Sequence, residues 1–85
     1  MTRLWPAGER LEIWDEEEPP AGFDWRGEPH RIQEVCNRWR VHVRWWEPGQ
    51  TVWREYFKVA TDTGLLCLVY HDLKSGEWFL ARLYD

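Results

Sequence analysis

The sequence contains little cysteine, the residue that cross-links many small domains through disulfides or zinc. Cysteine occurs only 2 times in 85 residues, and Cys36 and Cys67 lie far apart, with no CxxC pair and no nearby CxxH. This spacing does not fit a structural zinc site, and isolated thiols of this kind are normally reduced. We therefore predict two reduced, partly buried cysteines and a protein that uses no metal and no cofactor.

Long apolar runs and catalytic signatures are also missing. No stretch approaches the roughly 20 apolar residues of a membrane-spanning helix, and Met1–Glu9 has neither an apolar segment nor a small-residue cleavage site. There is no Gly-rich phosphate loop and no recognisable nucleophile motif. His71 and Asp72 are adjacent, but Asp72 is better explained as the start of a hairpin turn. These absences predict a cytoplasmic protein that is not an enzyme.

Tryptophan, in contrast, is in large excess, with 8 residues in a chain of 85. A domain of this size buries only about 60% of the surface that its unfolded chain exposes, so large rigid side chains help to build its core. The alternation of the sequence assigns five tryptophans to the core and leaves three partly exposed. The predicted core group is Trp25, Trp39, Trp45, Trp53 and Trp78, and the exposed group is Trp5, Trp14 and Trp46.

Charge is distributed unevenly along the chain. The formal net charge of −4 argues against indiscriminate binding to nucleic acid or anionic membranes. Residues 1–24 carry seven acids against two cations, whereas residues 25–58 carry seven cations against four acids. Nine of the eleven cations are arginine, which favours planar or stacked contacts over diffuse charge. Any anion-binding surface is therefore expected in the middle of the chain.

The spacing of apolar residues is mostly two, the period of a β-strand. Strands are predicted at Leu11–Ile13, Gly22–Arg26, from near His30 to Trp46, Thr51–Ala60, Leu65–Tyr70 and Glu77–Tyr84, with a short buried helix as the alternative at Leu65–Tyr70. The long strand must bulge or bend near Gln33-Glu34, because Ile32 and Val35 have opposite parity.

Six short strands without a convincing helix favour an all-β fold, a small antiparallel barrel or rolled sheet that is SH3-like. We expect a single domain over residues 1–85. Within it, residues 1–9 are expected to be loosely ordered and residues 15–21 to form an acidic, proline-containing loop.

A basic stripe on the long strand is the first candidate site. Alternate side chains about 7 Å apart can follow a phosphate backbone, and an exposed indole can stack on a base. The candidate nucleic-acid-binding residues are Arg26, Arg38, Arg40, His42, Arg44, Trp46, Arg54 and Lys58. Arg31 offers another extension of the stripe. The competing explanation is that these arginines lie on an ordinary polar exterior and pair with Glu28, Glu34, Glu47 or Glu55.

Hairpin register decides how large that stripe is. If Val43 pairs with Trp53, then Trp39 pairs with Phe57 and the next strand adds Arg54, Tyr56 and Lys58 to the stripe. The alternative register places His42 opposite Glu55. Apolar matching favours the first register. The second candidate site is for protein, at an edge strand or at the exposed group Trp5, Trp14 and Trp46.

Six short motifs follow one another between about Leu11 and Asp85. They are Phe23-Asp24-Trp25-Arg26-Gly27, Asn37-Arg38-Trp39-Arg40, Arg44-Trp45-Trp46-Glu47, Trp53-Arg54-Glu55-Tyr56-Phe57, Tyr70-His71-Asp72-Leu73 and Ser75-Gly76-Glu77-Trp78-Phe79-Leu80. Together they resemble a small bacterial domain family of unknown function. That family comprises stand-alone proteins and segments beside or fused to the catalytically inactive Y-family polymerase-like protein of the mutagenic DNA-damage-tolerance system.

The resemblance implies an accessory role in translesion synthesis and supplies no catalytic residues. We predict a non-enzymatic adaptor that acts through protein interaction, with the polymerase-like repair protein as its partner. The alternative is a single-stranded nucleic-acid binder that uses the basic, tryptophan-flanked strand face. Salt dependence separates the two, because phosphate contacts weaken steeply with added salt.

Overall fold

The computed structural model of the protein describes residues 3–14, 20–43 and 51–84. Its strands are β1 (Arg3–Ile13), β2 (Gly22–Trp25), β3 (Glu28–Val43), β4 (Val52–Thr61), β5 (Leu66–Asp72) and β6 (Trp78–Tyr84). Each strand pairs antiparallel with the next, and β6 pairs with β1 to close a barrel. The predicted all-β antiparallel barrel is confirmed, and the helix alternative at Leu65–Tyr70 is wrong because β5 occupies that segment.

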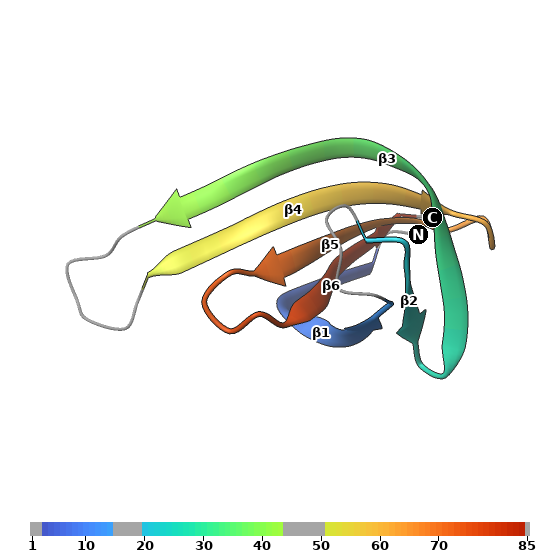
Figure 1. The fold of residues 1–85 in the computed structure, drawn as a ribbon, viewed down its shortest axis with the longest axis horizontal. Helices are drawn as coiled ribbons and strands as arrows, with labels where there is room; N and C mark the ends of the chain where they lie inside the picture. The colour runs from blue at the N-terminus through green and yellow to red at the C-terminus, as the bar shows by residue number, and fades with distance from the viewer. Residues whose placement is uncertain (1–2, 15–19, 44–50, 85) are drawn as a thin grey trace.

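β3 is long because it belongs to two sides of the barrel. Its first residues pair with β2, ending at Gly22↔Arg31, and the rest pair with β4 as far as Val43↔Val52. Two register shifts interrupt the second part, and the first lies between Ile32 and Glu34, where the sequence predicts a bulge. Bulges bend a strand, so β3 can turn from β2 onto β4, as its curved path in Figure 1 shows.

The far ends of β3 and β4 form a two-stranded arm. Pairing of β4 with β5 begins only at Arg54, so Val52 and Trp53 pair with β3 beyond the end of β5. Figure 1 shows this ribbon extending past the other strands. We call Asn37–Val43 together with Val52–Lys58 the β3–β4 arm; only its tip, at Val52 and Trp53, is two-stranded, because Arg54–Lys58 also pair with β5. The arm includes the part of the sheet where the sequence places its candidate stripe.

The core lies between the inward faces of the strands. Phe57, Val59 and Val69 are each 0% exposed, and they belong to one cluster of buried side chains. The whole cluster is Leu11, Phe23, Phe57, Val59, Cys67, Val69, Trp78, Leu80 and Leu83. Trp78 is buried as predicted, and Trp25 is partly buried against the cluster. Trp45 lies outside the described residues.

Two tryptophans predicted for the core are exposed. Trp39 is 38% exposed and Trp53 is 40% exposed. Both belong to the arm, and Trp53 lies where β5 no longer pairs alongside β4. An alternating pattern shows which side chains share a face, but not whether another layer covers that face. The assignment of these two residues to the core is therefore wrong.

The preferred hairpin register is also wrong. Val43 pairs with Val52, Trp39 pairs with Tyr56, and Arg40 pairs with Glu55. A shift by one residue moves a whole set of side chains to the opposite face of the sheet. Arg54 and Lys58 therefore do not share a face with Arg38 and Arg40, whose cross-strand partners point toward the barrel interior. The alternative that places His42 opposite Glu55 is wrong as well, because His42 pairs with Trp53.

The two cysteines differ in exposure, which gives a test of the fold. Both are free, but Cys36 is exposed, contrary to the prediction that it is partly buried, and Cys67 is only 1% exposed. Burial raises the pKa of the Cys67 thiol to about 12. Because the thiolate is the reactive form, we expect one thiol to react with a disulfide reagent at neutral pH in native protein and two in denaturant. Native Cys36→Ser protein should show almost no reaction, and two fast native thiols would contradict the packing of β5.

Candidate functional site

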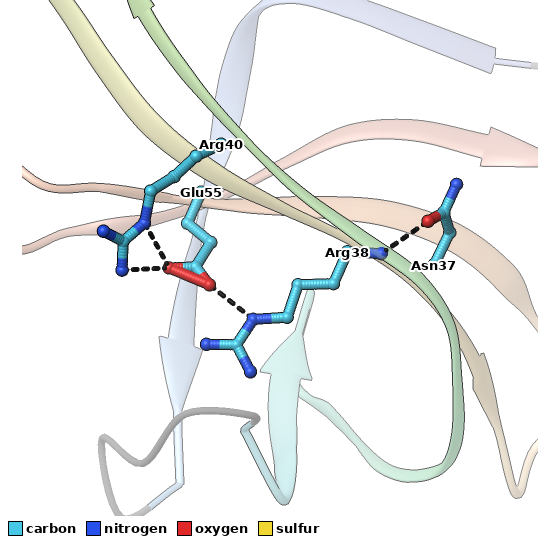
Figure 2. A network of polar contacts seen from close by, with 4 residues as sticks. All are labelled: Asn37, Arg38, Arg40 and Glu55. Atoms are coloured by element: carbon cyan, nitrogen blue, oxygen red, sulfur yellow. Dashed lines mark hydrogen bonds and ion pairs between the residues drawn. The ribbon is translucent and has the colours of Figure 1, made fainter.

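The inner face of the arm holds a buried carboxylate between two arginines. Glu55 is 3% exposed and pairs across the sheet with Arg40. Arg40 donates from Nη2 at 3.1 Å and from Nε at 3.2 Å to Glu55 Oε2, while Arg38 Nε donates to Oε1. Figure 2 shows the carboxylate lying between the two guanidinium groups. A single glutamate therefore orients both arginines.

Electrostatics determine how much positive charge this cluster presents. Burial by itself would raise the pKa of Glu55, but hydrogen bonds and charge from Arg38 and Arg40 lower that pKa below its ordinary value. The carboxylate is consequently ionised at neutral pH and cancels one of the two positive charges. The arginine side chains are still 43% and 61% exposed. The explanation that these arginines pair with a nearby glutamate is correct for both, and Glu55 is that partner.

Aromatic rings border the cluster on the same inner face. His42 stacks on its cross-strand partner Trp53, with ring centroids 5.4 Å apart. On the other side, His71 pairs with Glu55 across β4 and β5 and stacks on Trp78 at 4.4 Å. The inner face thus combines one net positive charge from the cluster with two ring stacks.

Arg54 and Lys58 lie on the outer face. The Arg54 guanidinium is 4.5 Å from the centre of the Tyr70 ring, and its Nη1 donates to Tyr56 Oη at 3.3 Å. Lys58 Nζ is 4.9 Å from the centre of the Tyr84 ring. The structure therefore divides the predicted stripe between two faces of one sheet.

Arg26 belongs to a different part of the barrel. It occupies a turn with Gly27 between β2 and β3 and has a φ of 51°, which is unusual for a residue other than glycine. Its Nη2 lies 3.2 Å from Glu9 Oε1, and its guanidinium lies over the rings of Trp5 and Trp25. Trp25 Nε1 also donates to Glu9. These contacts give Arg26 a structural role in joining β1 to the β2–β3 turn.

The predicted protein-contact tryptophans are held by their own chain. Trp5 packs against the core and meets Trp25 edge-on at 6.0 Å. The Trp14 ring lies so close to Gly22 that a Cβ atom there would come within 2.4 Å of it. Arg44 and Trp46 lie outside the described residues.

Sequence reasoning did not identify the residues that organise the arm. Glu55 was recognised only as a candidate ion-pair partner, and Trp39 and Trp53 were assigned to the core. The available signal was the alternation of Glu55, Phe57 and Val59, which places the glutamate on the same face as two core residues. A carboxylate at such a position needs cationic partners on the facing strand.

Metal-ligating side chains do not gather in the parts of the chain that the structure describes. No group of three or more histidine, cysteine, aspartate or glutamate residues is placed to hold a metal there. Asp72 Oδ1 accepts from the backbone N–H of Lys74 at 2.9 Å, which agrees with its predicted role in a turn. None of the described segments is a helix that could cross a membrane.

Along the arm, one edge of β3 has no described strand beside it, although the Arg38 N–H donates to Asn37 Oδ1 at 2.8 Å. Its pairing with β2 ends at Arg31, and from Asn37 to Val43 its only strand partner among residues 3–14, 20–43 and 51–84 is β4. The edge runs from the part of the sheet that includes β5 to the projecting tip of the arm. Unpaired backbone groups on such an edge can accept an added strand.

The fold defines a small closed β-barrel with a projecting two-stranded arm. The chain belongs to the family described as "Domain of unknown function (DUF6504)", which matches residues 8–85. It is 40% identical over 78 residues to "Protein ImuB" from two strains of Caulobacter vibrioides, NA1000 / CB15N and ATCC 19089 / CIP 103742 / CB 15. The alignment covers 78% of this chain but only 17% of each relative. No solved structure matches.

These findings confirm the family resemblance that the sequence motifs indicated. The shared region corresponds to a small part of ImuB, so it shows homology to one segment rather than to the whole relative.

Proposed function

We propose that the protein is a non-enzymatic accessory module of bacterial DNA-damage tolerance that docks on a protein partner through the open edge of β3. The observation that carries this proposal is the stretch Asn37–Val43, which pairs with β4 on one side only within the described part of the chain. The Arg38 N–H already donates to Asn37 Oδ1 at 2.8 Å, and the other N–H and C=O groups that face the open edge can add an extended segment as a further antiparallel or parallel strand. Binding of this kind needs no catalytic group.

Side chains on the arm supply specificity for such a partner. Trp39 and Trp53 are exposed on opposite faces, so an added strand would lie beside one aromatic surface on each face. The side chains of Arg38 and Arg40 are 43% and 61% exposed, which favours an added strand with acidic residues facing the inner side. Main-chain hydrogen bonds then provide affinity, and these side chains select the sequence.

The homology supports a polymerase-like partner. This chain aligns with a segment that makes up 17% of ImuB, so in that relative the matching segment is joined to the rest of the protein. A segment that is joined to the rest of ImuB is well placed to contact it, and the same contact is available to this chain. We therefore propose this polymerase-like protein as the partner and the cytoplasm as the place where they meet.

Hydrogen exchange can test the docking edge. The protein would be measured alone and with the purified polymerase-like protein encoded in the same genome. Apart from the Arg38 amide, which is bonded to Asn37 Oδ1, we expect the backbone amides within Asn37–Val43 that face the open edge to exchange rapidly in the free protein and slowly in the complex. Absence of a complex at micromolar concentration would refute the proposal, and so would a complex whose protection excludes β3.

The alternative function, single-stranded nucleic-acid binding, loses support on the inner face. Glu55 neutralises part of the charge of Arg38 and Arg40, and Arg54 and Lys58 lie on the opposite side of the sheet. The same shift in register places cations beside exposed aromatic rings on the outer face. That arrangement suits a nucleic-acid strand better than the predicted stripe does.

A further inference from the structure

The outer face of the sheet carries a continuous row of aromatic rings. Four directly paired residues on β3, β4, β5 and β6 form it: Trp39, Tyr56, Tyr70 and Phe79. Trp39 and Tyr56 are stacked, with centroids 5.4 Å apart and planes at 7°. The next two centroid distances along the row are 5.2 Å and 5.1 Å. Tyr70 is buried and Tyr56 and Phe79 are half-buried, whereas Trp39 is 38% exposed, so the most accessible ring of the row is at β3.

Cations lie beside this row on the same face. Lys58 and Arg82 belong to the neighbouring cross-strand row, Asn37, Lys58, Leu68 and Arg82, which contains no acid. Both side chains lie near the ring of Tyr84, at 4.9 Å and 5.6 Å from its centre. Arg54 flanks the aromatic row on its other side. We call Trp39, Tyr56, Tyr84, Arg54, Lys58 and Arg82 the outer platform.

The described carboxylates of this surface lie at its ends and not at the centre of the outer platform. Within the four cross-strand rows concerned, the acids are Asp72, opposite Arg54, and Glu34, opposite Ala60. They occupy different ends of the surface. Arg54 lies opposite Asp72 and interacts with that carboxylate. Among the described residues, Lys58 and Arg82 form no ion pair, unlike Arg38 and Arg40 on the inner face. Their charge is available to an external anion, and nearby rings already orient their side chains.

We infer that the outer platform binds single-stranded nucleic acid. A base stacks on the exposed face of Trp39, beside Tyr56, while Lys58 and Arg82 contact backbone phosphates. A single strand fits because its base faces are accessible, whereas a duplex buries them in its own stack. The overall charge of −4 keeps this binding local to the platform rather than general over the surface.

Fluorescence anisotropy with a labelled oligothymidine of about 12 nucleotides tests the inference, since sites of this kind span roughly 4–16 nucleotides. Trp39→Ala should weaken binding about 5- to 150-fold, the equivalent of about 1–3 kcal/mol for one stacked base. Trp39→Phe keeps an aromatic ring and should retain most of the affinity. Circular dichroism and thermal unfolding of each variant establish that it is folded.

Trp53→Ala is the matched control. Trp53 is 40% exposed, close to the 38% of Trp39, but it lies on the inner face of the same arm. Its removal should leave oligonucleotide affinity within about twofold, a limit well below the loss of one stacked base. If Trp53→Ala weakens binding and Trp39→Ala does not, the outer platform is not the site and the inference is wrong.

Salt dependence provides a second, independent readout. Lys58→Ala and Arg82→Ala should each reduce the slope of log K against log salt by about 0.7, the value for one phosphate contact to a single strand. The same oligonucleotide as RNA and as a duplex distinguishes the ligand: either single strand supports the inference, while equal affinity for the duplex contradicts stacking on Trp39. Absence of binding to both single strands at low salt would also overturn it, with no bearing on protein docking at β3.

Discussion

Gly8→Ala is expected to lower the free energy of unfolding by about 2–5 kcal/mol, the sum of a backbone and a packing cost. Gly8 has a φ of 77°, a conformation that costs an L-residue about 1–2 kcal/mol. Its added Cβ would lie 2.5 Å from Tyr70 Oη and 2.8 Å from Phe79 Cβ. Since Tyr70 is 3% exposed and packed between rings, it has little room to move.

Gly64→Ala separates the two costs. Gly64 has a φ of 88°, but a Cβ built there meets nothing within 4 Å. It should therefore lose only the backbone part, about 1–2 kcal/mol. Urea unfolding of both variants, with unchanged m-values, measures the difference. Equal losses would show that the close contact of β1 with Tyr70 and Phe79 adds no strain.

Glu55→Gln is expected to destabilise the protein by about 1–2 kcal/mol at neutral pH, in the range of hydrogen bonds to charged groups and below that of fully buried ion pairs. The smaller figure is appropriate because the Arg38 and Arg40 side chains are 43% and 61% exposed, so water screens them. The glutamine side chain has nearly the same volume as that of Glu55 and still fills its position on the inner face of the arm. The loss therefore reports the charge interaction rather than a cavity.

The pH dependence of that loss follows from the direction of the Glu55 pKa. Its folded-state pKa lies below the ordinary value of 4.5, so the unfolded chain takes up the proton first as pH falls. The stabilisation is complete above 4.5 and disappears as pH drops through the lower folded-state pKa. The stability curves of wild type and Glu55→Gln should therefore converge in acid.

Two comparisons make this prediction specific. Glu9 also has a lowered pKa, caused first by its hydrogen bond from Trp25 and then by Arg26, so only the difference between the two curves isolates Glu55. The exposed Glu34 provides a matched control, and Glu34→Gln should change stability by no more than about 0.5 kcal/mol. A Glu55→Gln loss that stays constant from neutral pH to acid would contradict the ion-pair cluster.

Much of the fold could be predicted from local patterns. Alternation located the strands that form the barrel, and the opposite parity of Ile32 and Val35 located the bulge that bends β3. The length of β1 was underestimated, because the strand begins at Arg3 and not at Leu11. The apolar signal near its start is weak, and pairing with β6 stabilises the strand there.

The candidate site could be predicted only in part. The sequence correctly placed Arg38 and Arg40 on one face, but it could not show that Glu55 joins them and that Lys58 does not. Those assignments depend on register across the hairpin, and registers that differ by one residue preserve the alternation within each strand. Exposure of Trp39 also depends on register, because its pairing with Tyr56 puts it on the outer face of the sheet and not in the core.

The amino-acid sequence by itself determined the all-β class, the order of the strands, the family and the side chains that share a face within one strand. Tertiary structure alone decided which face is covered, which residues meet across strands and which edge of β3 stays open. The physical reason is that alternation is a property of one strand. Register and coverage, in contrast, are set by packing between strands that are distant in sequence. Here Phe57 and Val59 face the interior, and Glu55 is buried because it lies on the same face of β4.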